Sequence, residues 1–573
     1  MRAASLGIVA LLLLPLALGE FWAYQLGLYF LYACAAMGVG LCWGQAGFLP
    51  LGQAMFFGLA AYLSGFALIA FGDEPWIFPL LPLIAAVSGI LAYAIGALVF
   101  RSRGESGPYF SMITLALSLL AFQIANNWND VTGGFNGLKG IPGLPGLDDF
   151  SDVYYVSVAV LIAALALGTW LIRAPIGVLW RALAQNERRV ALFGFDTNQL
   201  KAVAFGVSGL LGGIGGVIYA PQQNYVTPQL CGFGLSADLV IWAAVGGRNR
   251  LLGPVIGTLV VGTLTAELRD RMKFWEALMA AFFIIVVLAF PRGIIGALAP
   301  LTRLIEGRPR PKPPIPAPER PAPGGAARLS IEAVHARAGE VTILDRLSLL
   351  FDHPGVFCII GPNGAGKTST FNLLTGELAA AAGCVTLDGI AIDKLAPHRI
   401  ARLGIGRKLQ IPSVFADLSI ADNLSIALWS GRASRLDLLR PRLRRWTSPM
   451  LAELAQRYPF LAATERRAAE LSHGERQILE LAMALLTEPR ILLLDEPCAG
   501  LSPEETAAVI DVIRWAGRRL GGAIIVIEHD MSLVKELAET VYVLHNGTLL
   551  AQGSVSEIQV NPAVQAVYVG GEK

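Results

Sequence analysis

The sequence predicts a multi-domain chain in which an N-terminal polytopic α-helical membrane domain of about 8–10 spans precedes a cytoplasmic α/β domain with a phosphate-binding loop. Three observations predict this fold class. Hydrophobic residues make up 54% of the chain and charged residues only 15%, whereas soluble domains carry about 25% charged residues. No Lys or Arg occurs between Arg2 and Arg101, and all six histidines follow residue 330. A complete phosphate-loop motif lies in the second half.

The net charge of +2 excludes a strongly basic nucleic-acid-binding protein and a highly charged disordered chain. We therefore expect membrane lipid, and no nucleic acid, among the partners. The six cysteines are scattered without metal or redox spacing, which is typical of free thiols. Composition divides the chain into a membrane domain at 1–305, a linker at 306–328 and a phosphate-loop domain at 329–573.

Apolar runs in the first domain predict the membrane spans. They cover residues 6–18, 21–43, 48–71, 76–100, 109–126, 153–172, 202–220, 235–245, 251–268 and 274–290. Loops with acidic residues alternate with loops that contain Arg and Lys, and the basic side is expected to be cytoplasmic. Both ends of this domain are then inside. The start of the chain also resembles a secretory signal, with Arg2, an apolar run and Ala17-Leu18-Gly19, so removal of the first span stays an alternative.

The expected membrane interior has almost no ionisable side chains, and Asp238 is the main acidic exception. A proton-coupled carrier needs titratable groups there, so the energy for any transport must come from elsewhere. Frequent glycines in the segment from Gly206 to Gly216 favour close helix packing. The proline-rich linker favours an extended tether that reaches on the order of 50 Å; a proline-rich ligand for a signalling domain is the alternative reading.

The second half contains the phosphate loop. A short apolar strand at 356–360 leads into Gly361, Pro362, Asn363, Gly364, Ala365, Gly366, Lys367, Thr368 and Ser369. Glycines in this pattern let backbone N–H groups surround phosphates at the start of a helix. Lys367 then supplies a positive charge to the outer phosphates, and the Thr368 hydroxyl is placed to bind Mg²⁺. We expect ATP and Mg²⁺ as cofactors.

Two further strand ends supply groups for ATP hydrolysis. The strand at 491–494 is followed by Asp495, expected to bind Mg²⁺, and by Glu496, expected to act as the general base. The apolar run at 523–527 precedes His529, which is placed to hydrogen-bond the γ-phosphate. Gln410 offers an amide that suits both Mg²⁺ and a partner domain.

The order of these motifs resembles the ATP-binding-cassette (ABC) family. Residues 471–477, Leu-Ser-His-Gly-Glu-Arg-Gln, lie where that family has its signature. The resemblance covers residues 329–573 and implies that Ser472 and Gly474 face ATP bound to a second cassette. His473 and Glu475 stand where Gly and Gln are usual in the family. The aromatic residue that usually stacks on adenine is replaced by Ala338, so we expect weaker nucleotide binding at an intact hydrolytic site.

The membrane half resembles permeases of the import family for branched-chain amino acids and for urea and short amides. The residues concerned are Pro175-Ile176-Gly177, Arg181-Ala182-Leu183, Asn186-Glu187, Gly194, Asn126-Asn127-Trp128, residues 133–138, Gly246-Gly247-Arg248 and Leu252-Gly253-Pro254. Val178 stands where that family often has Arg. Together the resemblances imply a fused permease–ATPase subunit of a binding-protein-dependent importer in a bacterial-type inner membrane. The loop at 173–201 would then carry the motion of the cassettes into the spans.

The implied partners are a second permease, a second cassette and an external solute-binding protein; a homodimer is the alternative. Urea and short amides are favoured as substrates by three segments, residues 406–408, 471–474 and 110–114. Branched-chain amino acids are equally compatible with the sequence. Two other classes stay open. An ABC half-exporter also joins spans to a C-terminal cassette, and a nucleotide-regulated membrane protein with weak ATPase activity fits Ala338 and the altered signature.

Overall fold

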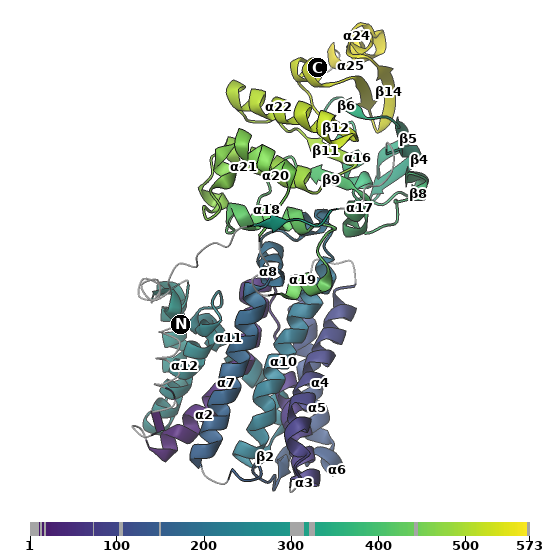
Figure 1. Cartoon of the computed structure of the whole chain (residues 1–573). Coiled ribbons are helices and arrows are strands. Elements are labelled where there is room, and N and C mark those ends of the chain that lie inside the picture. Colours follow the sequence, from purple (N-terminus) through teal and green to yellow (C-terminus); the bar gives the residue numbers. More distant parts are fainter. Residues whose placement is uncertain are drawn as a thin grey trace. The chain divides into compact units, whose positions relative to one another are not determined.

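The computed structural model describes residues 11, 14–15, 19–72, 74–101, 107–147, 150–290, 292–297, 314–319, 327–440 and 445–569 (Figure 1). Contacts divide the chain into two units. The first contains Met1–Ala184, Thr197–Pro311 and Leu439–Arg442, and the second contains Gln185–Asp196, Lys312–Leu438 and Leu443–Lys573. Most of the expected span at 6–18 and most of the linker at 306–328 lie outside the described residues.

The first unit is helical. Its main helices are α2 (Glu20–Gly40), continued by the π-helical turn η1 (Leu41–Ala46), α3 (Ala54–Phe71), α4 (Ile77–Val99), α5 (Pro108–Asn127), α7 (Phe150–Arg173), α8 (Pro175–Gln185), α10 (Thr197–Gln223), α11 (Phe233–Gly246), α12 (Leu252–Arg271) and α13 (Trp275–Ala289). Shorter elements are α6 (Asn129–Thr132), η2 (Gly134–Asn136), β1 (Leu138–Lys139), β2 (Tyr225–Val226), η3 (Pro228–Cys231) and α14 (Ile294–Ala297).

Six helices in the described part of the chain are long and apolar enough to cross a membrane: α2 with η1, α3, α4, α5, α7 and α10. They coincide with the predicted spans that begin at residues 21, 48, 76, 109, 153 and 202. The predicted spans at 235–245 and 274–290 coincide with shorter apolar helices, and the span predicted at 251–268 lies in α12.

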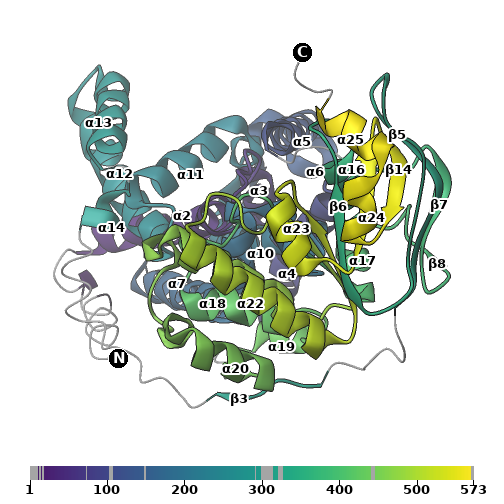
Figure 2. The ribbon, with the colours of Figure 1, turned by 90° about the horizontal axis from the view of Figure 1, so that it is seen from above.

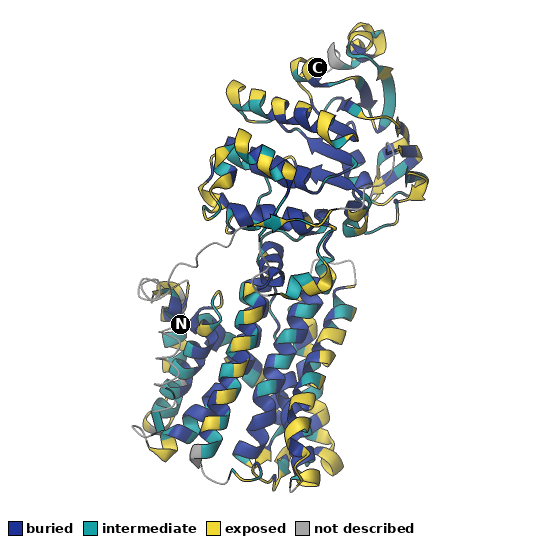
Figure 3. Cartoon of the chain, in the orientation of Figure 1, coloured by how far each residue is buried: buried dark blue, intermediate teal, exposed yellow. Residues whose placement is uncertain are grey.

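Helices α2 and α10 form the interior of the first unit. Of their most apolar windows, 83% and 72% of residues are buried, against 22% for α5, and Figure 3 shows the exposed residues along the outer helices. The glycines of α10 explain its close packing. A Cβ atom at Gly216 would lie 2.1 Å from the backbone oxygen of Phe57, so only glycine lets α3 and α10 approach this closely.

The second unit contains two sheets. The six-stranded sheet has the order β14-β13-β6-β12-β11-β9, and the four-stranded antiparallel sheet has the order β5-β4-β7-β8. Their bounds are β4 (Leu329–Ala338), β5 (Val341–Phe351), β6 (Gly355–Ile360), β7 (Ala382–Leu387), β8 (Ile390–Ala391), β9 (Ile405–Lys408), β11 (Ile491–Asp495), β12 (Ala523–Ile527), β13 (Thr540–His545) and β14 (Thr548–Gly553). A further pair joins β3 (Ile315–Pro316) to β10 (Trp446–Thr447).

Helices make up most of the rest of the second unit. They are α9 (Glu187–Leu192), α16 (Lys367–Leu374), α17 (Pro397–Leu403), α18 (Ile420–Trp429), α19 (Arg435–Leu439), α20 (Pro449–Arg457), η4 (Pro459–Ala462), η5 (Ala468–Glu470), α21 (His473–Leu486), α22 (Pro503–Leu520), α23 (Met531–Leu537), α24 (Val555–Val560) and α25 (Pro562–Val569). Figure 2 shows β5, β7 and β8 at one edge of the second unit and α18, α20 and α22 toward the opposite edge.

The parallel strands of the larger sheet place the site. Strands β9, β11, β12, β6 and β13 pair in parallel, and β11 and β12 are buried along their whole length. The sequences of such strands are continuous apolar runs because both faces of the sheet are covered. Their carboxyl ends share one edge, where ligands of such sheets bind.

Candidate ATP site

The phosphate loop connects β6 to α16, as the sequence predicts. Gly361, Gly364 and Gly366 have φ angles of 152°, 82° and 97°, which are left-handed values that other residues adopt only with strain. A Cβ atom at Gly361 would also lie 2.3 Å from the backbone oxygen of Leu544. This position therefore requires glycine both for its conformation and for the close approach of β13.

Lys367 is the first residue of α16 and is 9% exposed. Its Nζ donates to the backbone oxygens of Gly361 and Pro362 at 2.7 and 3.0 Å. Burial lowers the pKa of Lys367, while the carboxylates of Glu496 and Asp495 oppose this effect. The ammonium group is thus held inside the loop that is expected to surround the phosphates.

Asp495 and Glu496 follow the apolar residues of β11, and the structure brings Glu496 together with two other predicted groups. The Gln410 amide donates to Glu496 Oε2 at 2.8 Å, and His529 Nδ1 lies 4.0 Å from Glu496 Oε1. Glu496 has a φ of 43°. Non-glycine residues in this left-handed region cluster at functional sites because the conformation costs energy.

The residues around Asp495 fit a magnesium ion. Asp495 is 1% exposed, and its Oδ1 has no hydrogen-bond partner among the described residues, which leaves one buried acceptor for a ligand. Thr368 is exposed at the start of α16, and Gln410 keeps its carbonyl oxygen as a ligand atom. Within the described residues no group of three His, Cys, Asp or Glu suits a metal. Mg²⁺ is commonly held by one or two protein groups together with substrate phosphates.

The predicted signature residues form the start of α21. Ser472 is the N-cap of this helix: its Oγ accepts from the Glu475 N–H at 3.1 Å, and Glu475 Oε2 accepts from the Ser472 N–H at 2.9 Å. This reciprocal pair is a capping box, and it explains why Glu fits where the family usually has Gln. A Cβ atom at Gly474 would lie 2.1 Å from Glu505 Oε1, so any larger residue here would displace the Glu505 side chain.

Ala338 is the last residue of β4 and pairs with Val341 of β5. Its side chain is outside what the structure describes. The weaker nucleotide binding expected from the missing aromatic ring therefore stays a prediction from the sequence.

Sequence reasoning missed a network of charged residues that connects Asp495 to α9. Arg407 of β9 is 3% exposed, and its Nη2 donates to Asp495 Oδ2 at 3.2 Å. Its Nη1 donates to Glu377 Oε2 at 2.8 Å, and Arg188 Nη2 of α9 donates to the same carboxylate oxygen at 2.6 Å. Burial raises the pKa of Asp495, and the Arg407 guanidinium opposes this effect.

A second branch of the network is fully buried. Arg189 of α9 and Glu480 of α21 both have side chains with 0% exposure and lie 3.2 Å apart. Arg189 Nη1 also donates to the backbone oxygen of Arg407 at 2.8 Å, and Lys408 Nζ lies 4.0 Å from Glu480. Burial lowers the pKa of Arg189 and of Lys408, while Glu480 opposes both shifts.

Polar contacts at both ends of α9 hold the segment Gln185–Asp196 in the second unit. Asn186 caps α9 by accepting from the Arg189 N–H at 2.9 Å, and its Nδ2 donates to Ser413 Oγ at 2.7 Å. Arg402 of α17 donates to the backbone oxygen of Gly194 at 2.7 Å. A signal for part of this arrangement exists in the sequence, because Glu480 interrupts the otherwise apolar run of α21.

The comparisons with known proteins agree with these motifs. Residues 22–290 match the family described as "Branched-chain amino acid transport system / permease component". Residues 344–499 match the family described as "ABC transporter". Both matches lie in one chain, and they fall in its two different halves.

Individual relatives cover the second half. The chain is 36% identical to the high-affinity branched-chain amino acid transport ATP-binding protein LivG of Salmonella typhimurium over 249 residues, which are 42% of this chain and 97% of the relative. It is 34% identical over 250 residues to BraF of Pseudomonas aeruginosa, a protein of the same description, again with 42% and 97% covered.

Among solved structures, a nucleotide-free ATP-binding cassette from an ABC transporter aligns with 28% identity and a TM-score of 0.36, covering 42% of this chain and 98% of that one. The two family matches and the six apolar helices identify the chain as a multi-pass membrane protein with a nucleotide-binding ATP hydrolase domain on the cytoplasmic side. It belongs to the ABC transporter family and joins a permease of the branched-chain amino acid transport type to its ATP-binding cassette in one polypeptide.

Proposed function

We propose that this chain imports a small zwitterionic or polar solute at the expense of ATP, as part of a binding-protein-dependent transporter, and that branched-chain amino acids are its substrates. The observation that carries this proposal is the match of residues 22–290 to a permease component of that transport type, in a chain whose second half belongs to the same kind of system. We assign the membrane domain to 1–305, the linker to 306–328 and the cassette to 329–573.

In the proposed cycle, the residues of the candidate site divide the work on ATP. The loop Gly361–Ser369 and Lys367 bind the phosphates, and Glu496, oriented by its hydrogen bond from Gln410, takes the proton of the attacking water. His529 is near enough to Glu496 to bind the γ-phosphate beside it. Mg²⁺, held by Thr368, Asp495 and Gln410, would neutralise charge on the phosphates.

A second cassette completes the ATP site in this proposal. Ser472 and Gly474 begin α21, and a helix N-terminus favours a negatively charged ligand because its N–H groups and dipole point outward. We propose that these residues bind ATP that is held by the phosphate loop of the partner cassette. One cassette alone then hydrolyses ATP inefficiently.

Transmission to the membrane domain is proposed to run through α9. The two ion-paired branches at Arg188 and Arg189 connect this helix to Asp495 and to α21. A change at Asp495 on ATP binding or hydrolysis would therefore move α9, which lies in sequence between α8 and α10. This refines the route of motion expected from the sequence. Gln410 itself contacts Glu496, whereas the contacts to α9 come from residues near Gln410 in the sequence.

The urea and short-amide alternative loses part of its support in the structure. Arg407 and Lys408, which lean toward that branch, are buried in the charge network. Phe110 stacks on Phe100 with ring centroids 4.6 Å apart, and Ser111 donates to the backbone oxygen of Leu49. These contacts give Arg407, Lys408, Phe110 and Ser111 structural roles.

The experiment that tests the proposal is uptake of labelled leucine, isoleucine, urea and acetamide by cells with and without this chain and its partners. We expect uptake of leucine and isoleucine that requires ATP and an external binding protein. Uptake of urea alone would overturn the substrate assignment. Efflux of preloaded solute would overturn the direction and favour the half-exporter, and binding-protein-independent ATPase activity without transport would favour a regulatory protein.

A further inference from the structure

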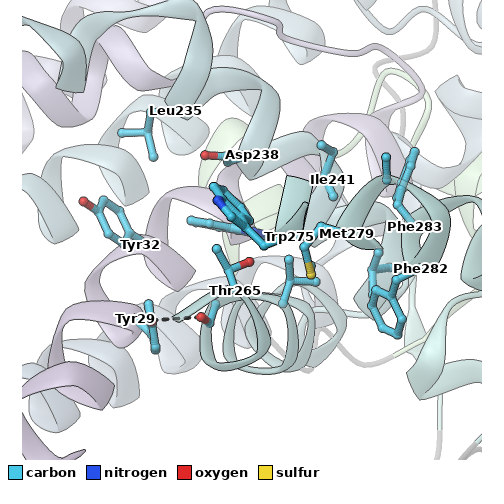
Figure 4. Close-up of a pocket in the computed structure, with 15 residues that line it drawn as sticks. Tyr29, Tyr32, Leu235, Asp238, Ile241, Thr265, Trp275, Met279, Phe282 and Phe283 are labelled. Atoms are coloured by element: carbon cyan, nitrogen blue, oxygen red, sulfur yellow. Dashed lines mark hydrogen bonds between the residues drawn. The ribbon is translucent and has the colours of Figure 1, made fainter. Parts of the chain in front are cut away.

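The first unit contains a pocket of about 480 Å³ that no part of the proposed ATP cycle uses. It lies among four helices, α2, α11, α12 and α13. Its lining residues used below are Tyr29, Tyr32, Asp238, Trp242, Trp275 and Met279, and Figure 4 shows Asp238 on one side of the pocket with Thr265 and Tyr29 on the other. Ligand pockets typically have 300–1,000 Å³, so this one suits a small molecule.

Asp238 is the one ionisable residue of α11, a short apolar helix. Its side chain faces the pocket and is exposed, and it has no hydrogen bond or ion pair to any described residue. A charged group among apolar helices is costly and normally faces a cavity or a partner of opposite charge. Among the described residues that line this pocket there is no Lys or Arg, so they offer the carboxylate no cation.

Aromatic side chains form the walls near Asp238, and internal contacts hold them in place. The Tyr29 hydroxyl donates to the backbone oxygen of Gly262 at 2.9 Å. Tyr32 packs against Trp242, with ring centroids 5.8 Å apart, and Trp275 lines the same pocket. The faces of aromatic rings attract cations, most strongly where water is excluded. The carboxylate and the aromatic rings therefore both favour a positively charged group in this pocket.

The rest of the pocket is apolar. Ile241, Met279, Phe282 and Phe283 extend along it away from Asp238 (Figure 4). This surface suits an aliphatic or aromatic body, and flexible Met side chains adapt to bodies of different shape. An uncharged polar solute such as urea matches neither the carboxylate nor this wall.

We propose that the pocket binds a small molecule with an ammonium group on an aliphatic body, and that Asp238 and the aromatic rings bind the ammonium group. The class includes branched-chain amino acids, so this inference rests on the proposed function and deepens it by naming a substrate-binding site within the permease. An ethanolamine lipid headgroup has the same ammonium chemistry, and the test must separate the two sources.

The test uses the assembled transporter in nanodiscs of phosphatidylglycerol, which has no amine. Binding of labelled leucine is measured in competition with isopentylamine, which lacks the carboxylate, and 4-methylpentanoate, which lacks the ammonium group. We expect isopentylamine to compete and 4-methylpentanoate to compete weakly. Asp238→Asn is expected to weaken leucine and isopentylamine binding about tenfold or more, because a charge-assisted hydrogen bond is lost.

The matched control is Asp130→Asn, which removes an exposed carboxylate of α6 elsewhere in the membrane unit and should change neither binding nor competition. Equal leucine binding by wild type and Asp238→Asn would overturn the proposal. Separation of the subunits in Asp238→Asn would overturn it in favour of a basic partner residue. Loss of leucine binding when phosphatidylethanolamine is added would assign the pocket to lipid. If the wild type transports no leucine, the proposed function fails; if Asp238→Asn transports leucine normally, only the pocket assignment fails.

Discussion

The second unit buries charged side chains in pairs, whereas the described helices of the first unit bury very few. Arg189, Lys408, Glu480 and Asp495 are at most 1% exposed and lie in one network. Among the described residues of the first unit, Lys201 is the buried charged one, and it packs over the Phe100 ring at 5.0 Å. Buried charges cost free energy unless they are paired. The pairing therefore offsets the cost of burying these charges, and the rarity of charge in the membrane-spanning helices makes Asp238 informative.

Replacement of Glu496, the proposed general base, is expected to have the largest effect on ATP hydrolysis. Glu496→Gln should still bind ATP but lower turnover by about 10²–10⁴-fold, because the group that accepts the proton of water is lost. Phosphate release and labelled-ATP binding by the assembled transporter measure the two effects. Glu504→Gln, at an exposed position in the first turn of α22, is the control. Undiminished hydrolysis by Glu496→Gln would refute the assigned role.

Breaking the buried pair tests whether the network connects ATP hydrolysis to transport. Glu480→Gln leaves both Arg189 and Lys408 without their carboxylate, and should lower the free energy of unfolding of the second unit by about 3–5 kcal/mol. Arg189→Met should lower the free energy of unfolding by a smaller amount, because Glu480 still pairs with Lys408. Both variants should transport less leucine per ATP hydrolysed.

Thermal unfolding and the ratio of leucine transported to phosphate released measure these changes. The control is Glu536→Gln, which removes an exposed partner of Arg514 at 3.0 Å and should cost below about 1 kcal/mol. An unchanged transport ratio in Arg189→Met would contradict the route through α9.

Arg407→Lys tests the branch that reaches Asp495. Lysine has no planar fork and cannot hold Asp495 and Glu377 together as arginine does. We expect about a tenfold rise in the Mg²⁺ concentration for half-maximal hydrolysis, since hydrogen bonds to charged groups contribute about 1.5–3 kcal/mol. A chelator should abolish hydrolysis in all variants. An unchanged Mg²⁺ dependence would separate Arg407 from the metal site.

The smallest expected effect concerns two similar helix caps. Ser472→Ala and Ser554→Ala each remove the side-chain cap of a capping box, in α21 and in α24, and each should cost about 1 kcal/mol. Only Ser472→Ala should also raise the KM for ATP several-fold, because only this residue is expected to face nucleotide. Equal KM values in the two variants would remove Ser472 from the ATP site.

The comparison also explains what could be predicted from the sequence. The phosphate loop, Asp495, Glu496 and His529 belong to local patterns at strand ends, so their order along the chain predicts where they lie. The Arg189–Glu480 pair joins segments far apart in sequence, and no local pattern identifies such a partner. The same holds for the pocket: Asp238 is visible as an acidic exception, but its aromatic neighbours come from three helices, α2, α11 and α13.

Glu475 illustrates a different limit. In the sequence it is a departure from the usual signature, and in the structure it completes the capping box of Ser472 and accepts from Arg466 at 3.0 Å. The substitution keeps the geometry of the helix start. A comparison of motifs shows only that Glu replaces Gln at this position. The local hydrogen bonds explain why Glu is tolerated there.

The most direct test of the account measures leucine accumulation in proteoliposomes that contain the assembled transporter, its binding protein and ATP on the cassette side. With every cassette in the assembly carrying the replacement equivalent to Lys367→Ala, we predict that accumulation falls to the level seen without ATP, because the phosphates lose their positive partner. Leucine accumulation that continues unchanged in this variant would contradict the claim that nucleotide hydrolysis by the cassettes drives the membrane domain.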